Sequence, residues 1–509
     1  MLRPYSIEGL YMSYLGLDVG TTGCKAVVFD DRGRQLSSAY REYAIISERE
    51  GWAELDSADV SDSCLAVIEQ AAKVCGEQVR GLAISSQGEA FTPIGPNGEI
   101  LGNAMVSSDA RAASIVTRFS REFGRERLYE ITGHTAHPMF TLFKLLWLRD
   151  NRPDVWAHAA HFYCFEELIQ RRLGLEPAIG WPLAGRTMMF DVRSHEWNAE
   201  ILAAVGLDAS KLARPLPSGA AVGVVASDMA CDLGLGERTM VVAGGHDQPC
   251  GALGAGVTSA GRAMYATGTV ECISPAFSAP VFSKDLFDSN LCTYDYTVKG
   301  MYTTVAFSLT GGNLLKWFRD EWGAQEVAEA ARTGASPYEL LLNAIPDAPT
   351  SLLVLPYFTP TGTPYFDTEI RGAILGLRLS TSRMEVLRAL LEGVAFEMRL
   401  NLDILNRSGV QVTELIAVGG GARSRCWVQL KADVMNTPIT TVAVTEAGCL
   451  GAAMLARAAD TGESLADVAR DWVRVTDVVE PNPEHAAIYE ERFPTYLKLY
   501  PTLKTLSMR

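Results

Sequence analysis

The chain alternates short, continuously apolar runs with longer stretches in which apolar residues recur at helical spacing. Residues 14–20 (YLGLDVG) and 24–30 (CKAVVFD) are runs of the first kind, and the Thr-Thr-Gly between them predicts a hairpin turn. A third strand is expected at 35–43, a helix at about 60–74 and another buried strand at 79–85. This first part of the chain therefore predicts a sheet with helices packed against it.

Segments of the same kinds continue along the rest of the chain. Residues 139–149 (MFTLFKLLWLR) predict a helix that is apolar over much of its surface, and residues 238–245 (RTMVVAGG) predict a buried strand. Further strands are expected at 352–358 (LLVLPYF) and at 414–418 (ELIAV), with a surface loop at 360–372 between them. Strands that alternate with helices throughout favour an α/β architecture.

A short echo of the N-terminal pattern divides the chain. Residues 262–269 (RAMYATGT) form a predicted strand followed by a Gly-Thr turn, as LDVGTT does near the start. The chain has 509 residues, which is too many for one ordinary core, because domains usually hold about 100–200 residues. Residues 256–261 are small and poor in core side chains. We therefore predict two domains, residues 1–256 and residues 257–509.

Composition narrows the range of partners and compartments. The net charge is −15, which disfavours binding to nucleic acid or to an anionic membrane. The ten cysteines form no C-x-x-C pair, so we expect reduced, buried thiols rather than a zinc site. No apolar run approaches the roughly 18 residues of a membrane helix, and residues 1–14 lack the apolar core of a signal peptide. We expect a cytoplasmic protein.

Three glycine-containing turns follow predicted strands, and each can hold phosphate oxygens. In DVGTTGCK, Gly20 allows close approach to a ligand, while Thr21, Thr22 and Lys25 supply hydroxyls and a positive charge. Asp18 beside this turn suits a hydrated Mg²⁺, which takes few carboxylates. The alternative is an ordinary hairpin turn.

The other two turns are ATGTVE, at residues 266–271, and VGGGARS, at residues 418–424. The second opens a predicted helix, whose free N–H groups attract anions. Neither a Walker motif nor a dinucleotide-binding G-x-G-x-x-G is present, so those two site types are disfavoured. Three such turns in one chain together favour the binding of nucleotide phosphates.

A lone carboxylate interrupts the small apolar stretch VVAGGHDQPCGALGAG. Asp247 follows a predicted strand and precedes Pro249, which is a good first residue for a helix. Glycines leave space around this carboxylate, which could accept a proton from a hydroxyl that attacks a terminal phosphate. The alternative is that Asp247 or Gln248 merely caps the helix.

A polar cluster follows the strand at 79–85. It contains Gln87, Glu89, Asp109 and Arg111, side chains that suit the hydroxyls of a sugar or polyol. The alternative is a set of solvated loop residues. Two histidine pairs, His134 with His137 and His158 with His161, have helical spacing but no evident third ligand, so a metal site is not expected there.

From about residue 14 to residue 460 the chain resembles the FGGY carbohydrate kinases. Residues 139–151 (MFTLFKLLWLRDN) match the first family signature, with Thr141 and Lys144 in place. Residues 372–393 match the second signature and depart from it mildly at Leu390. These two signatures are much more specific than the glycine turns.

The resemblance implies two actin-like, or ribonuclease H-like, α/β domains with an active-site cleft between them. It implies ATP and Mg²⁺ as cofactors, Asp18 near the metal, and Asp247 as the catalytic base. Glu89 falls where relatives contact the substrate, and we expect Gln248 beside the base to contact it too. The residues implied to bind the nucleotide are Thr21, Thr22, Gly268, Thr269, Gly312, Gly420 and Gly421, and we expect the positive charge of Lys25 to contact it too.

The substrate is less well determined than the reaction. Members that act on xylulose usually carry Q-M-H-G where this chain has Gln87-Gly88-Glu89-Ala90, and glycerol kinases carry an Arg at the position of Gly88. A ketopentose such as xylulose leads, and substrates of the glycerol, erythritol, ribulose or fuculose type are alternatives. A non-catalytic nucleotide-binding protein of the same fold is a further alternative. We expect a homodimer, although no residue pattern indicates one.

Overall fold

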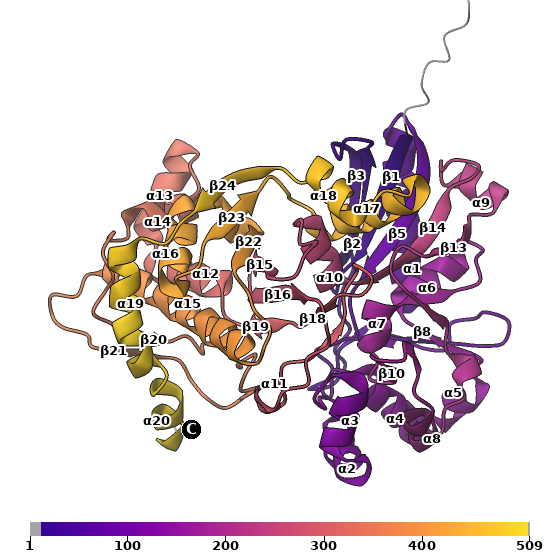
Figure 1. Ribbon diagram of the computed structural model, residues 1–509, viewed down its shortest axis with the longest axis horizontal. Coiled ribbons are helices and arrows are strands. Elements are labelled where there is room, and N and C mark those ends of the chain that lie inside the picture. Colours follow the sequence, from indigo (N-terminus) through magenta and orange to yellow (C-terminus); the bar gives the residue numbers. More distant parts are fainter. Residues whose placement is uncertain (1–11, 507–509) are drawn as a thin grey trace, which may run out of the picture.

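The computed structural model describes residues 12–506, which form two large sheets with helices around them, together with several two-stranded sheets (Figure 1). The segment 1–11, part of the stretch predicted to lack a signal peptide, lies outside the described residues. The first sheet has the strand order β13-β14-β5-β1-β2-β3. Its strands are β1 (Met12–Val19), β2 (Gly23–Asp30), β3 (Gln35–Glu42), β5 (Gln78–Ser86), β13 (Ala221–Val224) and β14 (Met240–His246).

The second sheet repeats the plan of the first. In the first sheet β1 pairs antiparallel with β2 and parallel with β5, and in the second β15 pairs antiparallel with β16 and parallel with β22. The strands of the second sheet are β15 (Arg262–Thr267), β16 (Glu271–Phe277), β17 (Tyr294–Asp295), β18 (Tyr302–Thr303), β19 (Ala306–Ser308), β22 (Glu414–Val418), β23 (Ile439–Val442) and β24 (Val475–Val479). The short echo in the sequence thus marks a structural repeat.

Amphipathic helices cover these sheets and bury their apolar faces. Helix α1 packs on β2 and β3, and the long helix α15 is buried over most of its length in the second half. Ser382 starts α15 with a capping box, in which its hydroxyl and Glu385 satisfy N–H groups at the helix start. The larger helices are α1 (Ser57–Val74), α6 (Phe165–Arg172), α10 (Asp247–Gly254), α12 (Gly312–Trp322), α15 (Arg383–Arg407), α16 (Arg425–Met435), α17 (Ala447–Thr461), α18 (Leu465–Trp472) and α19 (Pro483–Tyr496).

Two helices connect the halves. Helix α10 leaves β14 of the first sheet and contacts β15 and β16 of the second, whereas α17 leaves β23 of the second sheet and contacts β1, β5 and β14 of the first. In Figure 1 the yellow α17 lies beside the indigo strands of the N-terminal half. The predicted boundary at 256/257 stays a prediction. The helix-rich tail after residue 460 packs on both halves, because α18 adjoins α17 and β24 extends the second sheet.

Smaller elements lie between the main strands. In the first half they are β4 (Glu54–Leu55), β6 (Thr92–Ile94), β7 (Ala104–Met105), α2 (Ala113–Phe123), α3 (Arg125–Thr132), α4 (Thr141–Asn151), α5 (Pro153–His158), β8 (His161–Tyr163), β9 (Ala178–Gly180), α7 (Trp181–Gly185), β10 (Phe190–Asp191), β11 (Glu196–Trp197), α8 (Ala199–Val205), the 3-10 turn Ala209–Lys211, β12 (Arg214–Leu216) and α9 (Ser227–Asp232). In the second half they are α11 (Lys284–Asp288), α13 (Ala324–Thr333), α14 (Pro337–Ala344), β20 (Leu353–Leu355), β21 (Ala373–Leu375), the 3-10 turn Gly420–Arg423 and α20 (Leu499–Thr505).

The structure confirms the predicted strands and helices, except that the strand expected at 352–358 is limited to Leu353–Leu355, and it corrects two further details. Helix α10 begins at Asp247, so Pro249 is its third residue rather than its first. The segment 360–372 is not a plain surface loop, because Thr361 and Thr363 are buried and Phe366 lines a cavity. Tertiary contacts with Phe307 and Asn401 hold this segment, and such contacts leave no local sequence signal.

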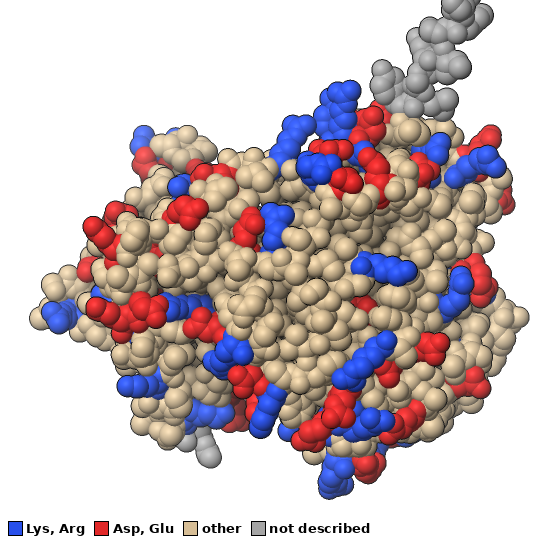
Figure 2. All heavy atoms as spheres, viewed as in Figure 1, with Lys and Arg blue, Asp and Glu red and all other residues tan. Residues whose placement is uncertain are grey.

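The surface carries charges of both signs. Figure 2 shows Lys and Arg side chains interspersed with Asp and Glu over the face in view, with no extended area of one sign there. Over residues 12–506, none of the helices combines the length and the apolar character needed to cross a membrane.

Candidate active site

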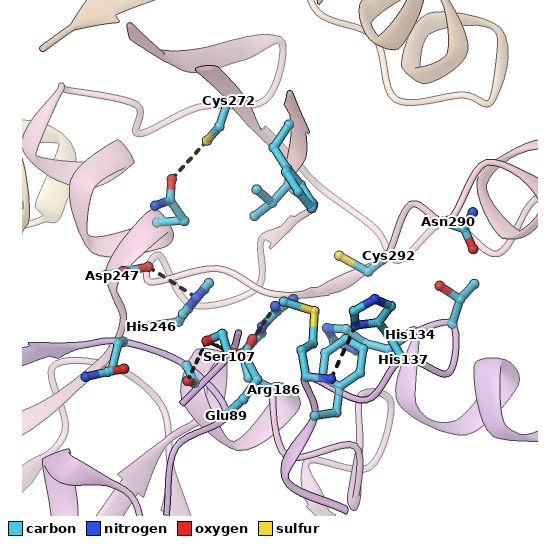
Figure 3. Close-up of a pocket in the computed structure, with 18 of the residues that line it drawn as sticks. Glu89, Ser107, His134, His137, Arg186, His246, Asp247, Cys272, Asn290 and Cys292 are labelled. Carbon is cyan, nitrogen blue, oxygen red and sulfur yellow. Dashed lines mark hydrogen bonds and ion pairs between the residues drawn. The ribbon is translucent and has the colours of Figure 1, made fainter. Parts of the chain in front are cut away.

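A cavity of about 240 Å³ lies between the two halves, where the β1–β2 turn meets the β15–β16 turn. Thr21 of the first turn and Val270 of the second both line it, together with Glu89 and Asp247. Phe366, from the segment 360–372, adds an apolar wall. Residues that are far apart in the sequence thus face one small space, in which Figure 3 shows Glu89 and Asp247 among the lining side chains.

Asp247 reaches this cavity from the junction of β14 and α10. The register between β14 and β5 shifts just before it, between Val242 and Gly245. A Cβ atom at Gly244 would lie 1.8 Å from the carbonyl oxygen of Ile84 on β5. Gly244 is therefore required for strand packing. The glycine that we expected to leave room for a ligand instead lets the strand end come close to its neighbour.

The surroundings of Asp247 suit a proton acceptor. Burial, followed by the negative charges of Asp18 and Glu89, raises the pKa of Asp247 to about 7. The Asp247 side chain is 32% exposed to solvent. Its Oδ1 atom is nevertheless enclosed and has no hydrogen-bond partner among the described residues. A carboxyl group with a pKa near neutrality is well matched to take a proton from a substrate hydroxyl.

Glu89 is held in an uncommon backbone conformation, with φ at 66°. Arg186 donates to its Oε1 with a 2.5 Å contact from Nε, and Ser107 donates to its Oε2 at 2.6 Å. From the first family signature, Thr141 donates its hydroxyl to the Glu89 carbonyl at 2.9 Å. The signature helix α4 therefore fixes the loop that presents Glu89 to the cavity.

Arg186 and Ser107 are cavity residues that the sequence did not predict. Arg186 is 97 positions from Glu89 and follows the short helix α7. Its neighbours, LAGRTMMF, carry no recognisable motif. Ser107 stands in VSSDAR, the stretch from which only Asp109 and Arg111 were predicted. No signal in the sequence distinguishes either residue from a surface polar residue.

Gln87 and Gln248 both line the cavity and also brace its walls. Gln87 Nε2 donates to the carbonyl of Gly20 at 2.9 Å, so it supports the first phosphate turn. Gln248 accepts a hydrogen bond of 2.9 Å from the thiol of Cys272 on β16. This second contact joins α10 to the other sheet beside the candidate base.

Asp109 and Arg111 lie away from this cavity. Arg111 forms ion pairs with Asp109 at 2.6 Å and with Glu54 at 2.7 Å, and its guanidinium stacks 3.7 Å from the centre of the Trp52 ring. Asp109 also accepts the backbone N–H of Ala53 at 2.7 Å. Their polar groups are thus occupied within the protein, and neither residue is among those that line the cavity.

The two histidine pairs have different surroundings. His134 and His137 line the cavity, whereas His158 pairs with Glu99 at 3.3 Å. Burial lowers the pKa of His134 to about 3 and that of His137 to about 4, so both rings are neutral. Within residues 12–506, no group of three His, Cys, Asp or Glu side chains is arranged to hold a metal ion.

The first phosphate turn has a carboxylate at its base. Asp18 accepts the Ser85 hydroxyl at 2.6 Å, and burial together with the charge of Glu446 raises its pKa. A Cβ atom at Gly448 would lie 2.9 Å from Asp18 Cγ, so a glycine is needed where α17 meets this carboxylate. Lys25 pairs with Glu446 at 2.5 Å. Carboxylate oxygens in this setting are the ligands that a hydrated Mg²⁺ prefers.

The second phosphate turn brings the other predicted nucleotide residues together. Gly312 N–H donates to the Gly268 carbonyl at 2.9 Å, so α12 begins directly against this turn. A Cβ atom at Gly421 would lie 2.7 Å from Thr267 Oγ1, whereas a Cβ atom at Gly420 would meet only open space. Three predicted segments, at residues 267–269, 311–312 and 419–421, thus form one continuous wall.

Comparison with known proteins identifies the family to which this chain belongs. Residues 13–254 match the FGGY family of carbohydrate kinases, N-terminal domain, and residues 263–459 match the C-terminal domain of the same family. The chain belongs to the FGGY family of carbohydrate kinases. As a member of this family it is an ATP-dependent carbohydrate kinase, and its fold is the predicted pair of actin-like domains.

Relatives within the FGGY family carry different substrate names. The chain is 27% identical to a xylulose kinase of Bacillus subtilis over 97% of both chains. It is 30% identical to an autoinducer-2 kinase of Klebsiella pneumoniae over 96% of this chain and 94% of the relative. The crystal structure of the xylulose kinase from Rhodospirillum rubrum superposes with a TM-score of 0.88 at 26% identity, covering 98% of this chain and 100% of the other.

Proposed function

We propose that this FGGY kinase transfers the terminal phosphoryl group of ATP to a hydroxyl of a small uncharged sugar, with a ketopentose such as xylulose as the leading substrate. One observation carries the proposal. The 240 Å³ cavity is lined by both phosphate turns, through Thr21 and Val270, and also by Glu89 and Asp247. A hydroxyl in this cavity would therefore lie between a proton acceptor and the place where phosphates bind.

Asp247 acts as the general base in this proposal. The sugar hydroxyl donates its proton to the carboxylate as its oxygen attacks the phosphorus, and the bond from phosphorus to the leaving oxygen of ADP breaks. Glu89, held by Arg186 and Ser107, fixes the orientation of the sugar. Gln87 and Gln248 supply amide groups at the same cavity.

We assign the nucleotide contacts to the β1–β2 turn, the β15–β16 turn and the wall formed by residues 267–269, 311–312 and 419–421. Backbone N–H groups and hydroxyls at Thr21, Thr22, Gly268 and Thr269 would hold the phosphates. Gly312, Gly420 and Gly421 would form the surface against the adenosine. Asp18 would hold Mg²⁺ through water, and the ion would neutralise phosphate charge when bound. Lys25 lies close by, in its ion pair with Glu446.

The charge of the cavity supports an uncharged substrate. Its ionisable groups include the two carboxylates Glu89 and Asp247, the guanidinium of Arg186 and neutral histidines. Arg186 is already engaged by Glu89 in a buried ion pair. A sugar acid would thus face an excess of negative charge, with no uncommitted cation among the described residues that line the cavity. Neutral ketoses and polyols meet no such repulsion.

The remaining parts of the proposal concern domains, location and assembly. We infer a division near residues 256–261 into a domain that holds the sugar and a domain that holds most of the nucleotide. Closure of the two would exclude water, which competes with the sugar as phosphoryl acceptor. A cytoplasmic location, where ATP is available, and a homodimeric assembly belong to the same proposal.

The deciding experiment measures sugar-dependent release of ADP from Mg-ATP. The panel contains xylulose, ribulose, fuculose, glycerol and erythritol, with gluconate as an anionic comparison. We expect turnover above the sugar-free rate with a neutral ketose and little with gluconate. The Asp247→Asn variant is the matched control for contaminating kinases. Binding of ATP without stimulation by any acceptor would instead support the non-catalytic alternative.

A further inference from the structure

His246 lies between the candidate base and a tyrosine from the other sheet. Its Nε2 is 3.1 Å from Oδ1 of Asp247, a contact that Figure 3 marks. Its Nδ1 is 3.0 Å from the hydroxyl of Tyr294. The imidazole is 7% exposed and Tyr294 is fully buried. Each nitrogen of this buried ring thus lies within 3.1 Å of a partner atom, one from each half of the molecule.

Tyr294 comes from β17, which pairs with β18 in the second sheet. The chain carries it against the first half, because Thr293 N–H donates to the Gly133 carbonyl at 2.8 Å. A Cβ atom at Gly185 would lie 3.3 Å from Tyr294 Cβ, so the glycine leaves room for this approach. The tyrosine is therefore placed by contacts between the two halves.

The tyrosine hydroxyl determines which nitrogen of His246 carries the proton. Nδ1 is the only hydrogen-bond partner of the Tyr294 hydroxyl among the described residues. A buried hydroxyl retains its proton and donates it where an acceptor is available, so Nδ1 accepts and Nε2 carries N–H. Nε2 lies 3.1 Å from Oδ1 of Asp247, an enclosed oxygen that makes no hydrogen bond among the described residues.

The other charged and titratable groups around the ring keep it neutral. Burial, followed by the charge of Arg186 and by His134, lowers the pKa of His246 well below its usual value. Glu89 and Asp18 act on the neighbouring Asp247 rather than on the ring. A neutral ring has one N–H to give, and its position depends on Tyr294.

We propose that His246 is a positioning residue: Tyr294 fixes it as the Nε2–H tautomer, and the dipole of this N–H attracts Oδ1 of Asp247, 3.1 Å away, so that Oδ2 is turned to the sugar hydroxyl. The proposal rests on the proposed role of Asp247 as base. Because Tyr294 belongs to the second half, the orientation of the base depends on how the two halves meet. His246 touches the base and Tyr294 acts through His246.

The test compares four variants by kcat and KM for the sugar that gives turnover. His246→Ala removes the imidazole N–H, and we expect kcat to fall about tenfold or more with KM nearly unchanged, because an interaction with a charged group is lost. His246→Gln places an amide N–H near the position of Nε2 and should restore kcat to within about threefold of the wild type. Tyr294→Phe should lower kcat about threefold to tenfold in the wild-type background.

The double variant His246→Gln/Tyr294→Phe separates positioning from packing. The amide of glutamine carries N–H groups whatever its neighbours are. Removing the tyrosine hydroxyl in this background should therefore cause no further loss of kcat. Equal losses from Tyr294→Phe in both backgrounds would overturn the proposal, as would equal losses from His246→Ala and His246→Gln. Thermal unfolding of each variant identifies any that are misfolded.

A measurement without substrate keeps this proposal separate from the proposed function. The protein has seven histidines, and ¹⁵N labelling of their rings reports which nitrogen carries the proton. The signal lost in His246→Gln identifies His246. We expect the Nε2–H form in the wild type and a mixture in Tyr294→Phe. A proton on Nδ1 in the wild type would overturn the proposal, whatever the sugar panel gives.

Discussion

Among single residues, the chemistry proposed for this kinase depends on the surroundings of three carboxylates. The negative charges of Asp18 and Glu89 act on Asp247, and each of the three carboxylates has different partners. Glu89 is engaged by Arg186 and Ser107, Asp18 accepts one hydroxyl, and Asp247 has an oxygen without a hydrogen bond among the described residues. The residue with the fewest partners is the one available to accept a proton.

Asp247→Asn should abolish most turnover. The amide keeps the shape of the side chain and cannot take a proton, so we expect kcat to fall on the order of 10²–10⁴-fold. The affinity for ATP, measured by calorimetry, should change little, because Asp247 is not among the residues proposed to contact the nucleotide. Turnover at the wild-type rate in a folded variant would contradict the assignment of the base.

Activity should fall as pH decreases through neutrality. The pKa of Asp247 is raised to about 7 by burial and by the nearby charges of Asp18 and Glu89, so the carboxyl is protonated and inactive below that pH. A pH profile of kcat/KM should show an acidic limb with a midpoint near the same value. A profile that stays flat well into the acidic range would mean that another group is the base.

The same shift predicts an effect on stability. The pKa of Asp247 is higher in the folded than in the unfolded state, so its ionisation destabilises the folded protein as pH rises from about 4 to about 7. Asp247→Asn lacks this ionisation, and its midpoint of thermal unfolding should exceed that of the wild type more at about pH 8 than at about pH 5. The same difference in unfolding midpoint between the variant and the wild type at both pH values would contradict the raised pKa of Asp247.

Among the turns and helices, the proposed nucleotide site contains glycines that have distinct roles. Gly421 and Gly312 are required by neighbouring protein atoms, since a Cβ atom at either would lie within 2.7 Å of another residue. At Gly420 a Cβ atom would meet nothing within 4 Å. Packing within the protein therefore does not require a glycine at position 420. We infer that the absence of a side chain there leaves space for the proposed nucleotide.

Gly420→Ala therefore separates folding from binding. We expect thermal stability to stay near that of the wild type and KM for ATP to rise several-fold, because the new methyl group would occupy space beside the nucleotide. Gly421→Ala is the comparison, and it should lower stability through its contact with Thr267. Unchanged KM for ATP in Gly420→Ala would place the nucleotide away from this turn.

Across the described part of the chain, the helices α10 and α17 connect the two sheets. A Cβ atom at Gly451 of α17 would lie 1.9 Å from the Cys250 carbonyl of α10, and one at Gly254 of α10 would lie 2.0 Å from the Ala447 carbonyl. The two helices thus cross in direct backbone contact. Asp460 at the end of α17 also accepts a hydrogen bond of 2.6 Å from Arg80 of the first sheet.

Gly451→Leu should weaken the link between the halves. The larger side chain cannot fit at the crossing, and we expect the free energy of unfolding to fall by about 3 kcal/mol or more, as for severe overpacking. Calorimetry should show the loss as a shift of the transition for the entire chain. Ala459→Leu, at an exposed position on the same helix, is the control and should change little. Equal free energies of unfolding for Gly451→Leu and Ala459→Leu would contradict the close packing of α10 against α17.

Features that follow local rules could be predicted from the amino-acid sequence alone. Strands such as β1 and β14, the hairpin turn at Thr21 and the strand-to-helix junction at Asp247 follow from apolar runs, glycines and a helix start. The repeat of the sheet was visible as a short echo, and the two signatures carried the family. Backbone conformation at these places is set mainly by neighbours in the chain, which the sequence displays.

The set of polar residues that share the cavity became evident only from the folded chain. Asp109 and Arg111, in the stretch VSSDAR, pair with each other away from the cavity, while Arg186 joins Glu89 from 97 positions away. Tyr294 likewise reaches His246 from the second sheet. Helix α17 packs on the first sheet, although it follows β23 of the second.

The range of the interactions explains this division. A turn or a helix start is decided by residues a few positions apart, whereas the direction of a side chain and the partner it meets depend on strand order, register and the contact between sheets. Glu89 and Asp109 look alike in the sequence, and only the packing makes one of them part of the cavity wall and the other part of a buried ion pair.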